Sequence, residues 1–305
     1  METSKPKKKK RKKIDWQLYC LLLPGVIWLI LFAYVPMNGL RMAFYNYNVF
    51  KGFEGSIFVG WSNFVTLFKG ADFPRAVKNT LQIGVLQILI CFPVPILLAL
   101  LITEIRVKFL SKITQTLTFL PYFISTVVVV GMTVNFLSPS TGVINLILNK
   151  LGFESIYFIM EAKYFKGIYI IMTLWQTAGF NAVVYIAAIA GIDKTLYESA
   201  SVEGATRIQQ IIHITIPGIM STIVVMLIMQ LGGIIKVGYE AIMLLYQPST
   251  YSAADVIGTY TYRLGIVQNN FGLSTAAGLF ESVVALVLVL TANALCKKFT
   301  ESSIL

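Results

Sequence analysis

The chain has few charged residues, one histidine and three cysteines. Charged residues occupy 13% of its 305 positions, whereas an average soluble domain has about 25%. The lone His213 cannot hold zinc by itself, and Cys20, Cys91 and Cys296 are too scattered for a metal framework or a set of disulfides. The scarcity of charge excludes an ordinary soluble globular domain, and the scattered ligand types predict no metal site.

The sequence also lacks the motifs of nucleotide hydrolysis and covalent catalysis. No glycine is followed directly by lysine, so the chain has no phosphate-binding loop of the form G-x-x-x-x-G-K-[ST]. No nucleophile, base and orienting group stand at a recognisable spacing. We therefore predict a non-enzyme, without catalytic residues or a cofactor of its own. If ATP drives its work, a separate chain must hydrolyse the ATP.

What the sequence does contain is long apolar runs. Hydrophobic residues make up 56% of the chain, and six runs approach the ~20 residues that a helix needs to cross a bilayer. These runs should be helices, because lipid leaves no backbone group unsatisfied and the short alternating strands of a barrel are missing. The prediction is an all-α integral membrane protein with six transmembrane helices, at about 17–36, 79–103, 114–137, 167–190, 217–237 and 275–296.

The first thirteen residues form a strongly basic tail. They hold eight of the 25 lysines and arginines, in a chain whose net charge is +11. Such a run can be a nucleic-acid patch or the start of a signal peptide. Directly before an apolar helix, and with no small-residue cleavage site after it, a cytoplasmic anchor is the better interpretation. We divide the chain into a basic tail, 1–13, and one transmembrane domain, 14–305, and expect no nucleic-acid partner.

Lysines and arginines outside the spans set the expected orientation. With the N-terminus inside the cell, 15 of them lie in cytoplasmic segments and nine in outer segments. Since cytoplasmic loops are enriched in these residues, both termini and the loop 191–216 should be cytoplasmic. The outer segments should hold two short helices, around Trp61–Phe68 and within 142–153. Pro93 and Pro95 should distort the second span.

The loop 191–216 and the residues after it are typical of a helix, a turn and a second helix. Asp193 can cap a short helix, Lys194–Val202. Gly204 supplies the backbone freedom of a turn, and Pro217 opens the next apolar run. The second helix should have an apolar side and a polar side. These sides are formed respectively by Ala205, Ile208 and Ile212 and by Arg207, Gln209 and Gln210.

A motif in this loop resembles that of a known family. Seven residues fit the pattern E-A-A, three residues, G, then roughly nine residues and L-P, with Ser199, Glu203 and Ile216 as mild departures. The pattern is similar to the cytoplasmic coupling loop, with its coupling helix between spans four and five, in permease subunits of type I ATP-binding-cassette importers. The plainer interpretation is an ordinary re-entrant loop. The resemblance implies that coupling to an ATPase involves Glu198, Ala200, Glu203, Gly204, Ala205, Ile216 and Pro217.

From about residue 14 to residue 300, the chain resembles the carbohydrate branch of these permeases, nearest its oligosaccharide and polysaccharide group. The points of resemblance are Asn79–Leu81, Leu120–Phe123, Asp255–Ile257 and Tyr260–Arg263. The resemblance implies the type I importer permease fold in the cytoplasmic membrane of a bacterium. It also implies several partners: a second permease, two ATPase subunits that bind ATP and magnesium, and an extracytoplasmic solute-binding protein.

Polar and aromatic side chains within the spans are candidates for the solute path. Sugars offer hydroxyl groups and apolar ring faces, so amides and flat aromatic rings suit them. The same side chains can instead form interhelical hydrogen bonds or lie at the membrane interface. Three charged residues, Lys236, Glu240 and Glu281, are candidates for an outer gate, and Glu240 lies one helical turn beyond Lys236 in the sequence. The alternative is that their side chains extend to the lipid headgroups. The full set is Tyr122, Trp175, Gln176, Asn181, Tyr185, Gln230, Lys236, Glu240 and Glu281.

The expected function is the import of a carbohydrate, an oligosaccharide above all, which a solute-binding protein delivers. One alternative is a permease of the same class for a non-sugar solute. Others are a transporter driven by an ion gradient and a membrane scaffold. Gradient-driven transporters usually show paired repeats, and no repeat is visible here. Co-purification of an ATPase chain distinguishes the importer from the last two alternatives.

Overall fold

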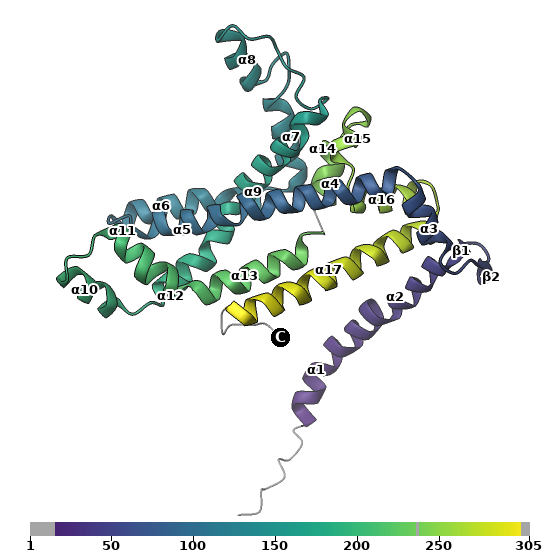
Figure 1. Cartoon of the computed structure of the whole chain (residues 1–305), viewed down its shortest axis with the longest axis horizontal. Helices are drawn as coiled ribbons and strands as arrows, with labels where there is room; N and C mark the ends of the chain where they lie inside the picture. The colour runs from purple at the N-terminus through teal and green to yellow at the C-terminus, as the bar shows by residue number, and fades with distance from the viewer. Residues whose placement is uncertain (1–15, 236–237, 300–305) are drawn as a thin grey trace, which may run out of the picture.

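The computed structural model describes residues 16–235 and 238–299, most of them in helices (Figure 1). The expected basic tail, 1–13, and Lys236 lie outside these residues. Within these described residues, four helices are long and apolar enough to cross a membrane, or up to six if each of two bent helix pairs is one span. The structure thus agrees with a helical membrane protein, and it breaks two of the six predicted spans.

The first candidate span, Tyr19–Phe44, stands away from the other helices along most of its length (Figure 1). None of its apolar window is buried. A helix that is apolar on all sides requires lipid or another protein around it. The last turn of the span does pack, against the sixth span. The span consists of α1 (Trp16–Leu29), a π-helical turn (Ile30–Tyr34), α2 (Val35–Met37) and a 3-10 helix (Asn38–Phe44).

A short β-hairpin, which the sequence analysis did not predict, follows the first span. β1 (Tyr45–Asn48) pairs with β2 (Gly52–Phe58) in antiparallel register. The short helix expected next in the chain is present as α3 (Ser62–Lys69). The Asn63 amide joins α3 to the hairpin, because it donates to two backbone carbonyls beside β1 at 2.9 and 3.0 Å.

The second span begins seven residues earlier than predicted, at Asp72, and continues to Thr103. It comprises α4 (Asp72–Leu86), a π-helical turn (Gln87–Cys91) and α5 (Pro93–Thr103). Proline has no N–H, and its ring crowds the turn before it. The Phe92 N–H accordingly donates to the carbonyl of Gln87, five residues back, at 3.2 Å. The distortion predicted near Pro93 is confirmed.

The prediction of a continuous third span at 114–137 is wrong. Helix α6 (Lys108–Phe119) and a 3-10 turn (Leu120–Phe123) meet α7 (Thr126–Phe136) at a bend of 99°. The fourth span, α9 (Ala162–Ala190), stabilises this break. The Gln176 amide on α9 donates to the Ile124 carbonyl, which the break leaves without a helical partner, at 3.0 Å.

The short helix predicted within 142–153 is confirmed as α8 (Val143–Lys150). Asn145 fixes this helix to the chain around it. Its side chain is 1% exposed, and its amide donates to the carbonyls of Leu137, Ser138 and Ile156 at 3.0 to 3.2 Å. Its side-chain oxygen accepts from the Ile156 N–H at 2.8 Å.

The fifth span is also bent, by 61°, where a single helix from 217 to 237 was predicted. One arm is formed by α11 (Arg207–Gln210), a π-helical turn (Ile211–Thr215) and α12 (Ile216–Gly218), and the other by α13 (Met220–Gly233). Because α13 ends at Gly233, Glu240 belongs to a separate helix, α14 (Tyr239–Leu245). The expected helical pairing of Lys236 with Glu240 stays a prediction, because Lys236 lies outside the described residues.

The chain after α14 leads into the sixth span. It forms a 3-10 turn (Pro248–Thr250), α15 (Tyr251–Ala254), α16 (Ile257–Tyr262) and a π-helical turn (Arg263–Val267). The sixth span is α17 (Phe271–Phe299), which begins four residues before the predicted 275 and runs past the predicted end at 296.

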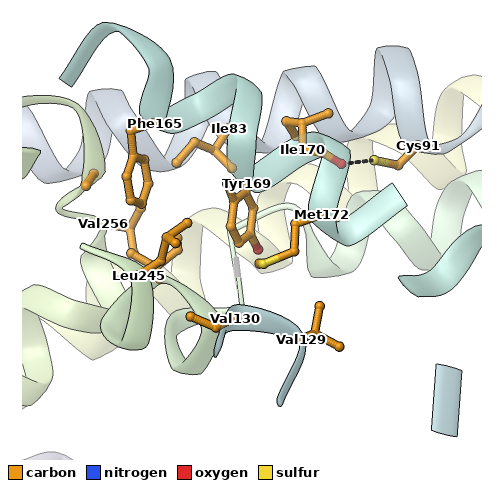
Figure 2. Packing of buried hydrophobic residues seen from close by; sticks show 12 residues of the cluster. Ile83, Cys91, Val129, Val130, Phe165, Tyr169, Ile170, Met172, Leu245 and Val256 are labelled. Atoms are coloured by element: carbon orange, nitrogen blue, oxygen red, sulfur yellow. Dashed lines mark hydrogen bonds between the residues drawn. The ribbon is translucent and has the colours of Figure 1, made fainter. Parts of the chain in front are cut away.

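A hydrophobic core lies where α4, α7, α9 and α14 meet, and Figure 2 shows its packing. Tyr169 and Phe165 of α9 are each 2% exposed and stand between Ile83 of α4 and Leu245 of α14. The Cys91 thiol donates to the Ile170 carbonyl at 3.9 Å. The core therefore joins the second, third and fourth spans with the segment that follows the fifth.

Candidate functional site

The coupling segment, residues 193–218, lies at the end of the bundle opposite the hairpin (Figure 1). Its first helix, α10 (Lys194–Val202), has the predicted bounds and the predicted cap. The Asp193 carboxylate accepts from the Thr195 N–H at 2.9 Å, which satisfies one of the free amides of the first turn. This bond lowers the pKa of the Asp193 carboxyl group.

The turn after α10 explains the spacing of the sequence motif. Gly204 has φ +83°, a left-handed conformation that glycine adopts without strain. Its N–H donates to the Ser201 carbonyl at 3.1 Å, and the Ala205 N–H donates to the Ala200 carbonyl at 2.9 Å. These two bonds make a Schellman motif. Three residues of the sequence motif thus occupy the positions that this C-terminal helix cap requires: Ala200, Gly204 and Ala205.

The second helix starts with a capping box. The Thr206 hydroxyl accepts from the Gln209 N–H at 3.4 Å, and the Gln209 side chain accepts from the Thr206 N–H at 2.7 Å. Placing Gln210 on a solvated polar side was wrong, because it is 6% exposed. Its amide donates to the Ser201 hydroxyl at 2.9 Å and so binds the second helix to α10.

Two more contacts fix the coupling segment. The Tyr197 hydroxyl of α10 lies 2.9 Å from the Thr215 hydroxyl. Arg207 lies 3.8 Å from the Glu104 carboxylate at the end of the second span. Both members of this ion pair are well exposed, so it contributes little stability by itself. The segment is therefore a single folded unit that includes the first arm of the fifth span and contacts the end of the second span.

The coupling segment exposes four large apolar side chains among its polar ones. Leu196, Val202, Ile208 and Ile212 are 52%, 90%, 70% and 51% exposed. Ile208 and Ile212 were expected on the apolar side of their helix, and in this chain that side faces outward. The other motif residues are distributed around this surface. Glu198, Glu203, Gly204 and Pro217 are exposed, and Ala200, Ala205 and Ile216 are half-buried.

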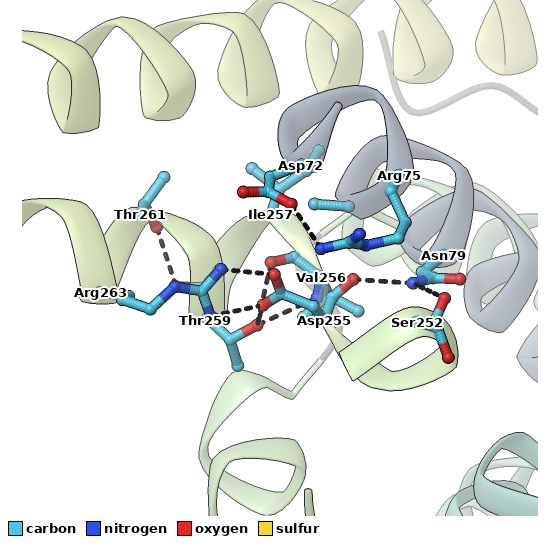
Figure 3. A network of polar contacts seen from close by, with 12 residues as sticks. Asp72, Arg75, Asn79, Ser252, Asp255, Val256, Ile257, Thr259, Thr261 and Arg263 are labelled. Carbon is cyan, nitrogen blue, oxygen red and sulfur yellow. Dashed lines mark hydrogen bonds and ion pairs between the residues drawn. The ribbon is translucent and has the colours of Figure 1, made fainter. Parts of the chain in front are cut away.

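A buried polar network joins α4 to the chain between α15 and the sixth span (Figure 3). Asn79 is 3% exposed and donates to the carbonyls of Ser252 and Asp255, each at 3.1 Å. The Asp255 side chain is fully buried, and Arg263 donates to its two oxygens at 2.6 and 3.2 Å. Three of the sequence stretches that carried the family resemblance, Asn79–Leu81, Asp255–Ile257 and Tyr260–Arg263, thus meet in space.

Three of the predicted path residues lie near the break in the third span. Tyr122 stacks on Phe180 of α9, with ring centroids 3.8 Å apart and planes at 7°. Gln176 donates to the carbonyl at the break, as described above. Trp175 is 47% exposed and faces an apolar cavity of about 610 Å³ between α7 and α9.

The other predicted path residues are spread over four helices. Asn181 and Gln230 are half-buried. Tyr185 is 2% exposed and packs in an apolar cluster with Ala182 and Ile219, so it offers no surface to a solute in this conformation. Glu240 is exposed in the first turn of α14, and Glu281 is half-buried on α17. A role in solute passage stays a prediction for all of them.

A cleft of about 680 Å³ between α14, α16 and α17 was missed by the sequence analysis. Of the predicted path residues in the described part of the chain, Glu281 is the one that lines it. Gly258, Tyr262 and Gly265 line it as well. Their spacing of four and then three residues places them on one helix face. This periodicity is the signal that could have revealed the cleft.

Comparisons with known proteins identify the family and support the fold. Residues 84–300 fit the family described as the binding-protein-dependent transport system inner membrane component. The chain belongs to this family. A curated relative is the polygalacturonan/rhamnogalacturonan transport system permease protein YteP of Bacillus subtilis. It is 41% identical over 98% of this chain and 95% of its own length. Protein LplB of the same organism is 38% identical over 96% and 92%.

Solved structures of family members are similar to this one along almost the whole chain. A crystal structure of a bacterial ABC transporter that imports the acidic polysaccharide alginate matches with a TM-score of 0.89 at 50% identity. The match covers 94% of this chain and 97% of that one. A second alginate transporter structure includes a periplasmic protein bound to alginate pentasaccharide. It matches with a TM-score of 0.89 at 49% identity, over 96% and 98% of the two chains.

Proposed function

We propose that this chain is one of two permeases in an ATP-driven importer that carries an oligosaccharide into a bacterial cell. The observation that supports this most is the near full-length similarity to permeases of polysaccharide importers, in sequence and in fold. An arabinooligosaccharide permease of Bacillus subtilis, AraP, is a further relative at 28% identity. The relatives differ in their sugars, so the proposal names a class of solute.

The coupling segment is the proposed contact with the ATPase. Its surface exposes four large apolar side chains, with Glu198 and Glu203 beside them. Exposed apolar groups in such number often mark a surface that binds another protein, so this surface suits a protein partner. The chain has no phosphate-binding loop, so ATP and magnesium would be bound by two separate ATPase subunits. This segment and both termini would then be cytoplasmic, in keeping with the distribution of lysine and arginine.

The hairpin end is the proposed outer face, where an extracytoplasmic solute-binding protein would dock. The buried network around Asp255 and Arg263 flanks α16, which lies nearer to this end than to the coupling segment (Figure 1). The network would hold the outer loops in place for docking. A second permease would complete the path and cover the first span, which is unburied in the single chain.

The solute class can be tested with the binding protein and the reconstituted complex. The binding protein is titrated with oligosaccharides of polygalacturonan, rhamnogalacturonan, alginate and arabinan, with amino acids and short peptides as non-sugar probes. Uptake of each probe into proteoliposomes is then measured with ATP inside. We expect binding and uptake of at least one oligosaccharide. Uptake of a non-sugar probe alone would contradict the proposal.

A further inference from the structure

The cleft between α14, α16 and α17 has the size and the aromatic lining of a site for a polar ring compound. Its volume of about 680 Å³ falls within the roughly 300–1,000 Å³ of small-molecule sites. Tyr239 and Tyr262 line it and are 50% and 37% exposed. A tyrosine ring combines an apolar face with a polar tip. A sugar ring has the matching form, with apolar faces and a rim of hydroxyl groups.

The hydroxyl groups in the cleft are arranged as hydrogen-bond acceptors. Thr261, Ser274 and Ser282 line it, and each donates its own proton to a backbone carbonyl, at 2.9, 2.8 and 2.9 Å respectively. A hydroxyl that has donated its proton still has lone pairs that can accept. These three oxygens can therefore receive hydrogen bonds from the hydroxyl groups of a sugar.

Glycines bring the walls together and leave the hollow open. A Cβ at Gly258 would lie 2.8 Å from the Cβ of Tyr239, and one at Gly265 would lie 2.7 Å from the Ser274 hydroxyl oxygen. These two glycines thus allow α14 and α17 to approach α16 and its π-helical turn. Gly278 differs, because a Cβ there would meet nothing within 4 Å. Its missing side chain is part of the open space.

The side of α16 that faces away from the cleft is buried and hydrogen-bonded to α4. Ile257 and Leu264, on the side away from the cleft, are 2% and 8% exposed. The Ile257 N–H donates to the buried Thr80 hydroxyl of α4 at 2.9 Å. The ion pair of Asp255 and Arg263 spans the same short helix. A site on a fixed wall can recognise a ligand without first ordering itself.

The face of α17 that lines the cleft also carries Glu281. Carboxylates within membrane helices normally face the bundle interior or a water-filled cavity. This face of the sixth span is therefore expected to adjoin a solute path. The cleft also lies nearer to the hairpin end than to the coupling segment (Figure 1). It stands where a solute released at the outer face would enter.

We propose that this cleft is a carbohydrate-binding station on the outer half of the transport path. Sugar rings pack against Tyr239 and Tyr262, and their hydroxyl groups donate to Thr261, Ser274 and Ser282. The proposal rests on the proposed function, oligosaccharide import. It assigns that function a site to which Glu281 belongs, whereas the other path residues predicted from sequence in the described part of the chain lie elsewhere. The competing occupant of the same space is a helix of the partner permease.

Filling the cleft is the direct test, in the full complex with partner permease, ATPases and binding protein. Gly278→Ala and Gly278→Leu place side chains of increasing size into open space. Gly167→Leu is the matched control, because Gly167 also has nothing within 4 Å but lines the apolar cavity between α7 and α9. The readouts are uptake of alginate pentasaccharide and oligogalacturonides, ATP hydrolysis stimulated by the loaded binding protein, and co-purification of the subunits.

The station requires Gly278→Leu to lower uptake by about tenfold or more, since even one extra methylene in a pocket can have that effect. ATP hydrolysis and subunit assembly should stay near wild type, and Gly167→Leu should transport normally. Normal uptake by Gly278→Leu would overturn the proposal. Loss of assembly in Gly278→Leu would overturn it too, because the partner permease would then fill the cleft. If wild type imports neither sugar, the proposed function fails instead.

Exchanging the aromatic ring gives a second test that adds no bulk. Tyr262→Ala removes the ring, whereas Tyr262→Phe keeps it and removes the hydroxyl group. We expect the half-saturating concentration of loaded binding protein to stay unchanged and maximal uptake to fall in Tyr262→Ala, with Tyr262→Phe close to wild type. Equal uptake by both variants and wild type would contradict a role of this ring in sugar binding.

Discussion

The hydroxyl of Tyr197 on α10 lies 2.9 Å from the hydroxyl of Thr215, eighteen residues further along the chain. Thr215 is 4% exposed and lies in the helix that leads into the fifth span. The bond therefore joins the two helices of the coupling segment across the turn at Gly204. If α10 contacts an ATPase, we expect this bond to help pass a displacement of α10 to the fifth span.

Removing this bond should weaken coupling. Tyr197→Phe and Thr215→Val each lose a hydrogen bond with a net value of about 1 kcal/mol. We expect each variant to import less sugar per ATP hydrolysed, and the double variant to lose no more than either single one. A double-mutant cycle on the ratio of uptake to hydrolysis measures this. Strictly additive losses would show that the two residues act separately.

Gly204 tests the turn itself. Its φ of +83° strains a β-branched residue, at a cost of order 1–3 kcal/mol. Gly204→Val should abolish uptake with the permease still in the membrane. Gly204→Asn is the matched control, since asparagine tolerates this conformation. Wild-type uptake and ATP hydrolysis in Gly204→Val would refute the coupling role of the turn.

Gly179 tests the packing of α9 on the broken third span. A Cβ at this position would lie 1.9 Å from the Thr118 carbonyl oxygen, and such overpacking costs about 1–3 kcal/mol or more. Gly179→Ala should lower the thermal unfolding temperature of the purified protein. Gly131→Ala on α7, where a Cβ meets nothing within 4 Å, should not. Equal unfolding temperatures for the two variants would show that the contact relaxes freely.

The ion pair of Asp255 and Arg263 should stabilise the outer loops far more than an exposed pair does. Breaking a buried pair costs about 3–5 kcal/mol, and an exposed pair contributes about 0–1 kcal/mol. Asp255→Asn should therefore destabilise strongly, and Asp72→Asn should not, because the Asp72 side chain is 61% exposed in its pair with Arg75. Thermal unfolding and limited proteolysis of the outer loops compare the two. Similar results for both would mean that the buried pair is not needed.

Local rules predicted the first helix of the coupling segment to the residue. The cap at Asp193 and the stop at Gly204 depend on residues within a few positions of each other, so the sequence alone contains them. Gln210 was misplaced because its partner, the Ser201 hydroxyl, lies on the other helix. Its burial depends on tertiary contact, which helical periodicity does not reveal.

The break in the third span is stabilised by a residue on another helix. The third span bends where Gln176, fifty-two residues away, satisfies the free carbonyl of Ile124. Gly179 lets α9 approach closely enough for this to happen. An apolar run of the right length predicts a straight helix, and it does not reveal a stabilising partner on a distant helix. The sequence also did not predict the cleft lined by Tyr262, because residues from three separate segments form it.

The proposed function requires this permease to work with an ATPase through its coupling segment. The direct test is oligosaccharide uptake by proteoliposomes that contain either this chain alone or the whole complex, with and without internal ATP and with and without an ion gradient. The account predicts uptake by the complex that requires ATP and no gradient, and none by the chain alone. Gradient-driven uptake by the purified chain alone would contradict it.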